Sequence, residues 1–293
     1  MPEAPEVDAS YAVCRRIARH ARSNFHLAFY LLPRPKRDAL FALYAFMRLV
    51  DDVSDTPGDL AAKQKGIAAW RAQLDAAFAG DTGLHPVLPA FADTVRRFGI
   101  PARYFNDLIS GAEMDLSISS YATFDHLREY CYRVAGTVGL TCLHVFGFGD
   151  PRALDLAEKL GLAFQLTNIL RDVRRDYEIG RVYLPQDTLH LYGCRPSDLG
   201  QGNLRPALRE VLASAAERAQ QSYAEGARLV PLVDEDSRAA LWGLVRIYSS
   251  LLAKIRSRGF DVFSSRVCLT SKEKFAILLR ARLGRWDESD ALA

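Results

Sequence analysis

Apolar residues recur at helical spacing through most of this sequence, and no segment shows the regular alternation of a half-buried β-strand. The helical runs end at Pro, Gly or Asp, as in Thr56-Pro57-Gly58. They predict helices over residues 9–22, 37–55, 60–78, 87–98, 101–116, 124–145, 151–177, 204–229, 234–257 and 271–283. There is no long linker, low-complexity tract or fixed repeat. The sequence therefore predicts one all-α domain over residues 1–293, with its core at about residues 10–285.

The composition excludes several classes of protein. Apolar residues make up 49% and charged residues 25%, as in globular proteins and unlike disordered chains. A net charge of +3 is too small to indicate nucleic-acid binding. The five cysteines are widely spaced and predict neither a zinc site nor a disulfide framework, so a reducing cytoplasm fits best. We expect no signal peptide, because the first eight residues are acidic and lack a basic flank and an apolar core. We expect no membrane-spanning helix, because no window approaches 18 uncharged apolar residues.

The segment over residues 165–176 carries the first chemical signal. Helical geometry places Asn168, Asp172 and Asp176 above one another, with about 40° of drift per step. Two carboxylates at this spacing repel each other by about 1 kcal/mol in water and about 3 kcal/mol at a half-buried site. The stripe is therefore either a solvated charged face or the lining of a cation site.

The helix predicted over residues 37–55 ends in a second acidic stripe. Tyr44, Arg48, Asp51 and Asp55 share one face of a helix that is otherwise mostly apolar. An acidic helix end exposed to solvent would show the same pattern. Carboxylates near the carboxyl end of a helix oppose the helix dipole, however, so a purely structural role is unfavourable for these acids.

Both stripes place acids at positions i and i+4 after an apolar run, about 120 residues apart. Two such helices facing each other would line a cavity with carboxylates from both sides. Mg²⁺ takes oxygen ligands, keeps several waters and is completed by substrate phosphates, so the pattern favours Mg²⁺ and a diphosphate. Arg48 and Arg171 beside the acids could bind phosphate oxygens in two-pronged fashion, although an ordinary salt-bridge network would contain the same residues.

Four segments in order make the pattern specific: YAFMRLVDDVSD at 44–55, YCYRVAGTVG at 130–139, QLTNILRDVRRD at 165–176 and GRVYLP at 180–185. Together they resemble the motifs of the squalene and phytoene synthase family, over about residues 20–270. Either acidic motif alone would indicate only an isoprenoid diphosphate enzyme. The resemblance implies a class I isoprenoid synthase fold, which is a bundle of helices around a deep central cavity, and the head-to-head joining of two prenyl diphosphates.

The resemblance also implies roles for individual residues. The residues that would bind Mg²⁺, or Mn²⁺ in its place, are Asp51, Asp55, Asn168, Asp172 and Asp176. The residues at diphosphate-contacting positions are Arg48, Arg171 and Arg266, with Asp115 at an acidic position near the cavity mouth. The residues near the reacting carbons are Tyr44, Tyr130, Gln165 and Tyr248, which together with Arg48 form the predicted catalytic set.

The resemblance predicts a Mg²⁺-dependent enzyme that converts two farnesyl diphosphates through presqualene diphosphate towards squalene or a related C30 product. The close alternative is a phytoene synthase that uses two geranylgeranyl diphosphates, and a further alternative is a non-catalytic helical protein that binds isoprenoid diphosphates. The sequence leaves open the final product, the proton acceptor, the use of NADPH and the oligomeric state. It shows no Gly-rich nicotinamide-binding pattern.

The segment over residues 272–286 interleaves Phe275, Ile277, Leu278, Leu279, Leu283 and Trp286 with Lys274, Arg280, Arg282 and Arg285. Such a basic amphipathic helix either packs on the bundle with a solvated basic face or rests on an anionic membrane surface. Peripheral contact at the inner surface of the membrane is therefore kept as a hypothesis beside a cytoplasmic location.

Overall fold

Helices account for nearly all regular structure in the computed structural model, which describes residues 4–21, 24–56, 58–202 and 204–284. Over these residues there is no β-strand, and two isolated bridges join Ser120 to Val182 and Phe148 to Val233. The predicted all-α fold class is confirmed. The α-helices in chain order are α1 (Ala4–Ala21), α2 (Asn24–Phe29), α3 (Arg34–Asp55), α4 (Leu60–Phe78), α5 (Leu88–Phe98), α6 (Ala102–Ser117), α7 (Phe124–Cys131), α8 (Thr137–Phe146), α9 (Arg152–Glu178), α10 (Gln186–Leu191), α11 (Pro206–Gly226), α12 (Glu235–Ser257) and α13 (Ser271–Arg282).

The predicted helix over residues 124–145 differs in one detail. It forms α7, a five-residue π-helical turn η1 (Tyr132–Gly136), and α8, without leaving the helical path. The region after Gly180, which showed no regular pattern, contains α10 and the 3₁₀ turn η2 (Pro196–Gly200). A further 3₁₀ segment, η3 (Ala227–Leu232), joins α11 to α12.

Two helices, α3 and α9, carry most of the predicted site residues. α3 begins with Pro35 in its first turn, where a missing N–H removes no helical hydrogen bond, and it buries Phe41, Phe46 and Val50. α9 has 27 residues and is the longest of the described helices; its buried residues include Leu166. The polar carboxyl ends of both helices are thus held in place by long stretches packed in the core.

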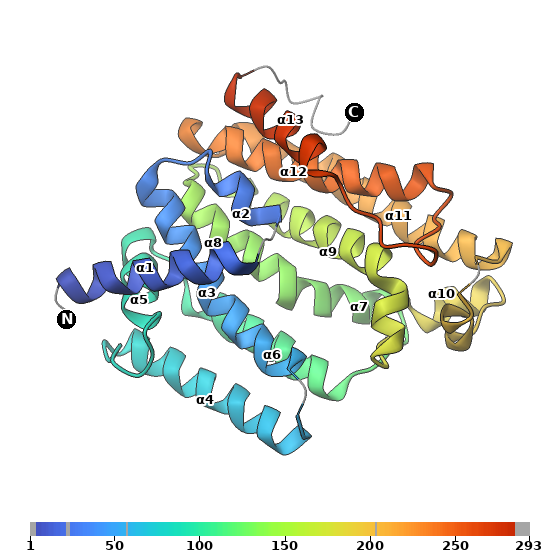
Figure 1. Cartoon of the computed structure of the whole chain (residues 1–293), viewed down its shortest axis with the longest axis horizontal. Helices are drawn as coiled ribbons and strands as arrows, with labels where there is room; N and C mark the ends of the chain where they lie inside the picture. Colours follow the sequence, from blue (N-terminus) through green and yellow to red (C-terminus); the bar gives the residue numbers. More distant parts are fainter. Residues whose placement is uncertain (1–3, 22–23, 57, 203, 285–293) are drawn as a thin grey trace.

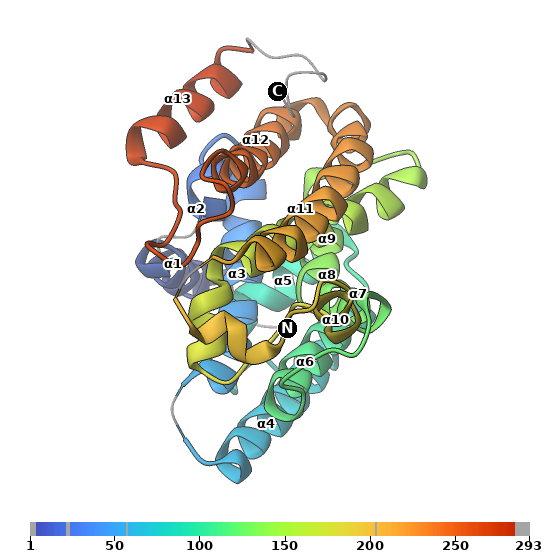
Figure 2. The same ribbon diagram turned by 90° about the vertical axis from the view of Figure 1, so that its right-hand side faces the viewer.

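The site lies where these two helices and their neighbours meet. α9 packs against α8, α11 and α12, and α3 also packs against α8 (Figure 1). In the view turned by 90°, α13 lies outside α12 at one edge of the molecule and α4 lies at the opposite edge (Figure 2). Helices α3, α8 and α9 therefore occupy the centre of the bundle.

Glycines let α9 approach η1 and α8 closely. A Cβ at Gly161 would lie 2.6 Å from the carbonyl oxygen of Ala135, and a Cβ at Gly139 would lie 2.8 Å from the carbonyl oxygen of Ala157. Both distances are far shorter than the roughly 3.5–4.0 Å at which non-bonded atoms attract. A side chain at either position would push the two helices apart. Within the part of the chain that is described, no helix combines the length and apolar character that crossing a membrane requires.

Candidate active site

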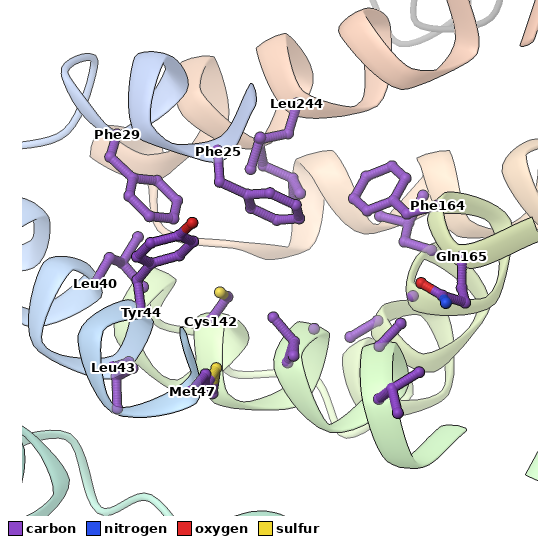
Figure 3. Close-up of a pocket in the computed structure, with 18 of the residues that line it drawn as sticks. Phe25, Phe29, Leu40, Leu43, Tyr44, Met47, Cys142, Phe164, Gln165 and Leu244 are labelled. Carbon is purple, nitrogen blue, oxygen red and sulfur yellow. The ribbon is translucent and has the colours of Figure 1, made fainter. Parts of the chain in front are cut away.

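A cavity of about 250 Å³ lies between α2, α3, α8, α9 and α12. Its wall is mostly apolar, and the largest apolar side chains in it are Phe25, Phe29, Met47, Phe146 and Phe164. Figure 3 shows the phenylalanines of α2 facing the residues of α3 across this space. The lining runs from Leu40 to Asp51 on α3, about three helical turns or roughly 16 Å. Such a wall suits a hydrocarbon chain.

The polar residues of the cavity come from the middle and the carboxyl-terminal half of α3 and α9. Tyr44, Arg48 and Asp51 lie on α3, and Gln165 and Asn168 lie on α9. Tyr44 and Gln165 extend into the cavity from facing walls (Figure 3). The structure therefore places polar groups from both predicted stripes around one space.

Asp51 holds a charge that the protein compensates poorly. The nearby guanidinium of Arg48 forms its ion pair with Asp52 and not with Asp51. Asp51 is exposed by its accessible surface and lines the cavity, so its carboxylate is surrounded by protein while solvent still reaches it. Burial within the protein, together with the neighbouring Asp55 carboxylate, raises the pKa of Asp51 to about 7. A bound cation would relieve both effects.

Asp172 on α9 is held in the opposite way. Arg171 donates from Nε to both carboxylate oxygens at 3.0 Å, and Arg266 donates from Nε at 2.8 Å and from Nη2 at 3.2 Å. Burial acts to raise the pKa of Asp172, but the hydrogen bonds from the two arginines outweigh it and hold this pKa below its ordinary value. Asp172 is therefore an ionised carboxylate between two guanidinium groups.

Arg181, just after α9, lies among acids from three helices. Its Nη1 is 3.6 Å from Oδ1 of Asp55 and 3.9 Å from Oδ1 of Asp115, and its Nη2 donates to the backbone carbonyl of Asp115 at 3.4 Å. Burial and the nearby Asp172 raise the pKa of Asp176 to about 7, although Arg181 acts to lower it. One guanidinium thus acts on the ends of α3, α6 and α9.

Tyrosines surround the Asp115 carboxylate. Tyr130 and Tyr183 donate hydrogen bonds to its two oxygens at 3.2 and 3.0 Å. The rings of Tyr130 and Tyr183 stack with centroids 5.2 Å apart, and Tyr121 stacks on Tyr183 at 5.9 Å. Burial raises the pKa of Tyr130 well above its ordinary value, so its hydroxyl stays protonated. This cluster fixes the position of Tyr130.

Tyr248 on α12 lies behind the cavity wall. Its ring stacks on Phe164 with centroids 4.5 Å apart and lies 5.6 Å from the ring of Phe25. Both phenylalanines line the cavity, so Tyr248 supports the wall from outside.

The residues present fit a hard divalent cation. Oδ1 of Asn168 is buried and accepts no hydrogen bond from any described residue, which is costly unless a ligand uses it. The raised pKa values of Asp51 and Asp176 likewise indicate acids without sufficient counter-charge. In residues 4–21, 24–56, 58–202 and 204–284, no three Asp, Glu, His or Cys side chains could hold a metal unaided. Mg²⁺ does not require such a group, because waters and substrate phosphates complete its shell.

The predicted residues therefore fall into three groups. Those that line the cavity are Tyr44, Arg48, Asp51, Gln165 and Asn168. Those linked by ion pairs, hydrogen bonds or charge beside its polar end are Asp55, Asp115, Tyr130, Arg171, Asp172, Asp176 and Arg266. Tyr248 forms the third group, behind the wall.

Sequence reasoning missed three contributors. Phe25 and Phe29 were not proposed as cavity residues, although they are four residues apart in an apolar segment. Tyr183 lies inside the matched segment at residues 180–185 but received no role. Its hydrogen bond to Asp115 spans 68 positions, so no local pattern could reveal it.

Comparison with known proteins agrees with this architecture. Residues 18–273 match the family model described as squalene/phytoene synthase. A phytoene synthase of Mycobacterium tuberculosis is 40% identical over 281 residues, which covers 94% of this chain and 91% of the relative. A phytoene synthase of Arthrospira platensis is 36% identical over 290 residues, which covers 94% of this chain and 93% of the relative.

Solved structures show the same fold. A dehydrosqualene synthase in complex with a ligand superposes with a TM-score of 0.88 at 31% identity, covering 96% of this chain and 99% of the other. A squalene synthase from Alicyclobacillus acidocaldarius superposes with a TM-score of 0.82 at 30% identity, covering 88% of this chain and 97% of the other. The chain thus belongs to the squalene/phytoene synthase family, whose members are head-to-head prenyltransferases.

Proposed function

We propose that this protein condenses two molecules of farnesyl diphosphate head to head, through presqualene diphosphate, towards squalene or a related C30 product. The observation that carries the proposal is a single cavity with two unlike parts, an apolar length and a polar end formed by Arg48, Asp51 and Asn168. A prenyl diphosphate has the same division into a hydrocarbon chain and a charged head. The apolar wall would hold the chains, and the polar end would hold the diphosphates.

The arginines of the polar end would bind diphosphate. Arg171 and Arg266 each grip Asp172 with two nitrogens, and this fork geometry also suits phosphate oxygens. Exchange of the carboxylate for a diphosphate would leave Asp172 free to act as an oxygen ligand. Arg48 would approach the same groups from α3, because it lines the cavity one turn before Asp51.

The ions that fit this site are Mg²⁺ or Mn²⁺, with Asp51, Asp55, Asn168, Asp172 and Asp176 as the proposed oxygen ligands. Bound there, Mg²⁺ would supply the positive charge that favours departure of the diphosphate. The remaining requirements fall on the chain. The allylic cation that is left must be attacked by the double bond of the second substrate before water reaches it, and a wall of phenylalanine and leucine side chains excludes water.

Aromatic rings and a fixed polar group would guide the later steps. The face of Tyr44 lies in the cavity, where it can stabilise positive charge by cation–π attraction. Closure of the cyclopropane ring releases a proton. The Tyr130 hydroxyl stays protonated because its pKa is raised, and it already donates to Asp115, so it is not available as a base; the departed diphosphate is our candidate acceptor.

The names of the relatives support an alternative to farnesyl diphosphate as the substrate. The proteins at 36% and 40% identity are phytoene synthases, whereas the squalene-type solved structures are 30–31% identical. Geranylgeranyl diphosphate, which is one isoprene unit longer, is therefore the alternative substrate, with a phytoene-type product.

The deciding experiment measures diphosphate release from farnesyl and geranylgeranyl diphosphate, with Mg²⁺ and with EDTA, followed by product analysis with and without NADPH. We expect Mg²⁺-dependent release and a C30 product. A C40 product would replace the main proposal by the alternative. If neither substrate turned over while one still bound, the protein would be a non-catalytic isoprenoid diphosphate-binding protein.

We further propose that the reaction takes place in the cytoplasm, at the inner surface of the membrane. The described cysteines are all free thiols, as expected in a reducing compartment. A water-insoluble hydrocarbon product also needs an apolar destination close to the enzyme.

A further inference from the structure

Helix α2 is apolar on two opposite faces. Phe25 and Phe29 lie on its inner face and line the cavity (Figure 3). Leu27 is exposed on the outer face, and so is Tyr30 directly after the helix. A helix face that carries apolar side chains is normally packed against another element. The inner face of α2 is covered by the bundle, whereas its outer face is open.

Helix α13 presents a second exposed apolar stripe. Phe275, Leu279 and Leu283 are spaced by four residues and are 65%, 44% and 54% exposed. Lys272 lies one turn before this stripe and Arg282 lies at its end; both are exposed, and neither forms an ion pair with another described residue. An apolar stripe flanked by unpaired basic residues has the chemistry of a helix that lies in a lipid interface.

The two exposed surfaces lie on the same side of α12. Leu31, two residues after α2, and Leu278 of α13 both approach the position of Gly243 on α12, with atoms 3.6 and 3.3 Å from a Cβ built there. Figure 2 shows α2 and α13 on one side of the molecule. Leu241 and Leu244 of α12 line the cavity. The exposed apolar surface is therefore directly outside the wall that α2 and α12 form.

We propose that this surface, the α2–α13 face, rests on an anionic lipid bilayer, and that the hydrocarbon product passes between α2 and α12 into the lipid. The face consists of Leu27, Tyr30, Phe275, Leu279, Leu283, Lys272 and Arg282. Its apolar residues would enter the bilayer, and the two basic side chains would pair with anionic headgroups at its edge. The lipid contact is independent of the activity, whereas the exit route rests on the proposed function.

The exit route follows from the charge of the product. A prenyl diphosphate is retained at the polar end of the cavity, but a product without diphosphate has no group for Arg48 or Asn168 to hold. Transfer of such a molecule into water is unfavourable in proportion to its apolar area. A wall segment that is apolar both inside and outside offers a continuous path from cavity to lipid.

The first test is sedimentation of the full chain with vesicles of phosphatidylcholine, alone or mixed with phosphatidylglycerol. We expect binding to the mixed vesicles. Binding should weaken roughly tenfold or more in Lys272→Ala/Arg282→Ala, and also in Phe275→Glu/Leu279→Glu. Leu191→Glu is the matched control, because Leu191 is 75% exposed on α10, away from this face, and should bind like the unchanged protein.

The outcomes separate lipid from other partners. Wild-type protein that stays in the supernatant with mixed vesicles would overturn the proposal. So would equal binding by all variants. If size-exclusion chromatography showed a wild-type dimer that Phe275→Glu/Leu279→Glu converts to a monomer, with no vesicle binding, the face would be a contact between two copies of the chain.

The second test addresses the exit route by turnover. Mixed vesicles should raise the steady-state rate of the wild-type enzyme several-fold and leave the single-turnover rate unchanged. Leu27→Glu and Phe275→Glu/Leu279→Glu should keep the single-turnover rate but lose the stimulation. Vesicle binding without any stimulation would remove the exit route and keep the lipid contact. Absence of turnover in every protein would count against the proposed function, not against the binding result.

Discussion

Asp51 on α3 and Asp172 on α9 are the first acids of two stripes with the same spacing, but they are in opposite electrostatic states. On α3, Arg48 pairs with Asp52, and the pKa of Asp51 rises to about 7 through burial and the carboxylate of Asp55. On α9, two arginines grip Asp172 and hold its pKa below the ordinary value in spite of burial. The same spacing of acids can therefore leave one carboxylate, Asp51, with too little positive charge around it and place another, Asp172, between two guanidinium groups.

This difference suits a site that binds a metal and an anion together. The α3 side offers uncompensated carboxylate and attracts cations. The α9 side already contains guanidinium groups that a diphosphate can take over from Asp172. If both acids serve the reaction, replacing either should lower activity to a similar extent, whereas the two replacements should change the free energy of unfolding differently.

The largest expected effect is on catalysis. Asp51→Asn and Asp172→Asn should each lower kcat/KM for diphosphate release by about 10²- to 10³-fold, because each removes a charged oxygen that the proposed reaction requires. Steady-state assays of diphosphate release in Mg²⁺ would measure this. Asp8→Asn, at an exposed position on α1, is the control. Wild-type turnover in either site variant would show that its stripe is not part of the active site.

The second prediction concerns stability without metal. Asp172→Asn should lower the free energy of unfolding by about 1 to 3 kcal/mol, because it leaves Arg171 and Arg266 without their counter-charge. Asp51→Asn should leave this free energy unchanged or raise it slightly, because it removes a poorly compensated carboxylate. Urea denaturation in EDTA at neutral pH measures both. Changes of the same sign in the two variants would contradict the comparison.

A smaller effect is expected for the tyrosine cluster beside the α3 side. Tyr183→Phe removes hydrogen-bond partners of Tyr130 and Asp115 and should lower kcat about tenfold with little change in KM. The matched control is Tyr121→Phe, which removes a buried hydroxyl that no described residue pairs with and should be neutral. Equal losses in both variants would assign Tyr183 a packing role only.

The smallest effect is a pH dependence of the metal-free protein. Asp51 and Asp176 have pKa values of about 7 when folded, against an unfolded value near 3.9, so the folded state binds more protons between these values. Full linkage for two such shifts would amount to several kcal/mol, but solvent screens these partly exposed carboxylates, so stability should fall by about 1 kcal/mol as pH rises from about 4 to about 7. Mg²⁺ should abolish this fall. A profile that is flat or rises in EDTA would show that these acids are already compensated.

The helices were predictable because the spacing of apolar residues encodes them directly. The helix predicted over residues 60–78 matches α4 at both ends. The π-helical turn η1 was not predicted, since a single turn of wider helix is too short to be distinguished from α-helix by the spacing of apolar residues. A helical fold class can thus be derived from sequence even where the local helix type cannot.

Within the site, the identity of the acids was predictable and their charge state was not. Acids at i and i+4 mark Asp51, Asp55, Asp172 and Asp176 in the sequence itself. The pKa of Asp172 depends on Arg266, which lies 94 positions away in a segment between helices. The pairing of Tyr130 with Tyr183 spans 53 positions. Such partners depend on how the helices pack, and local spacing carries no record of that.

The close contact of α9 with η1 and α8 limits how this cavity can change. Gly139 and Gly161 line it, and neither position has room for a side chain. At these two positions backbone packs against backbone, so substitution there would deform the bundle before it reshaped the cavity. A change in the length of chain that the cavity holds is therefore easier at the opposite wall, where Phe25, Phe29 and Leu244 can be exchanged for smaller or larger residues. One part of the cavity wall is thus fixed by backbone contact, whereas the part formed by these three side chains has room to change size.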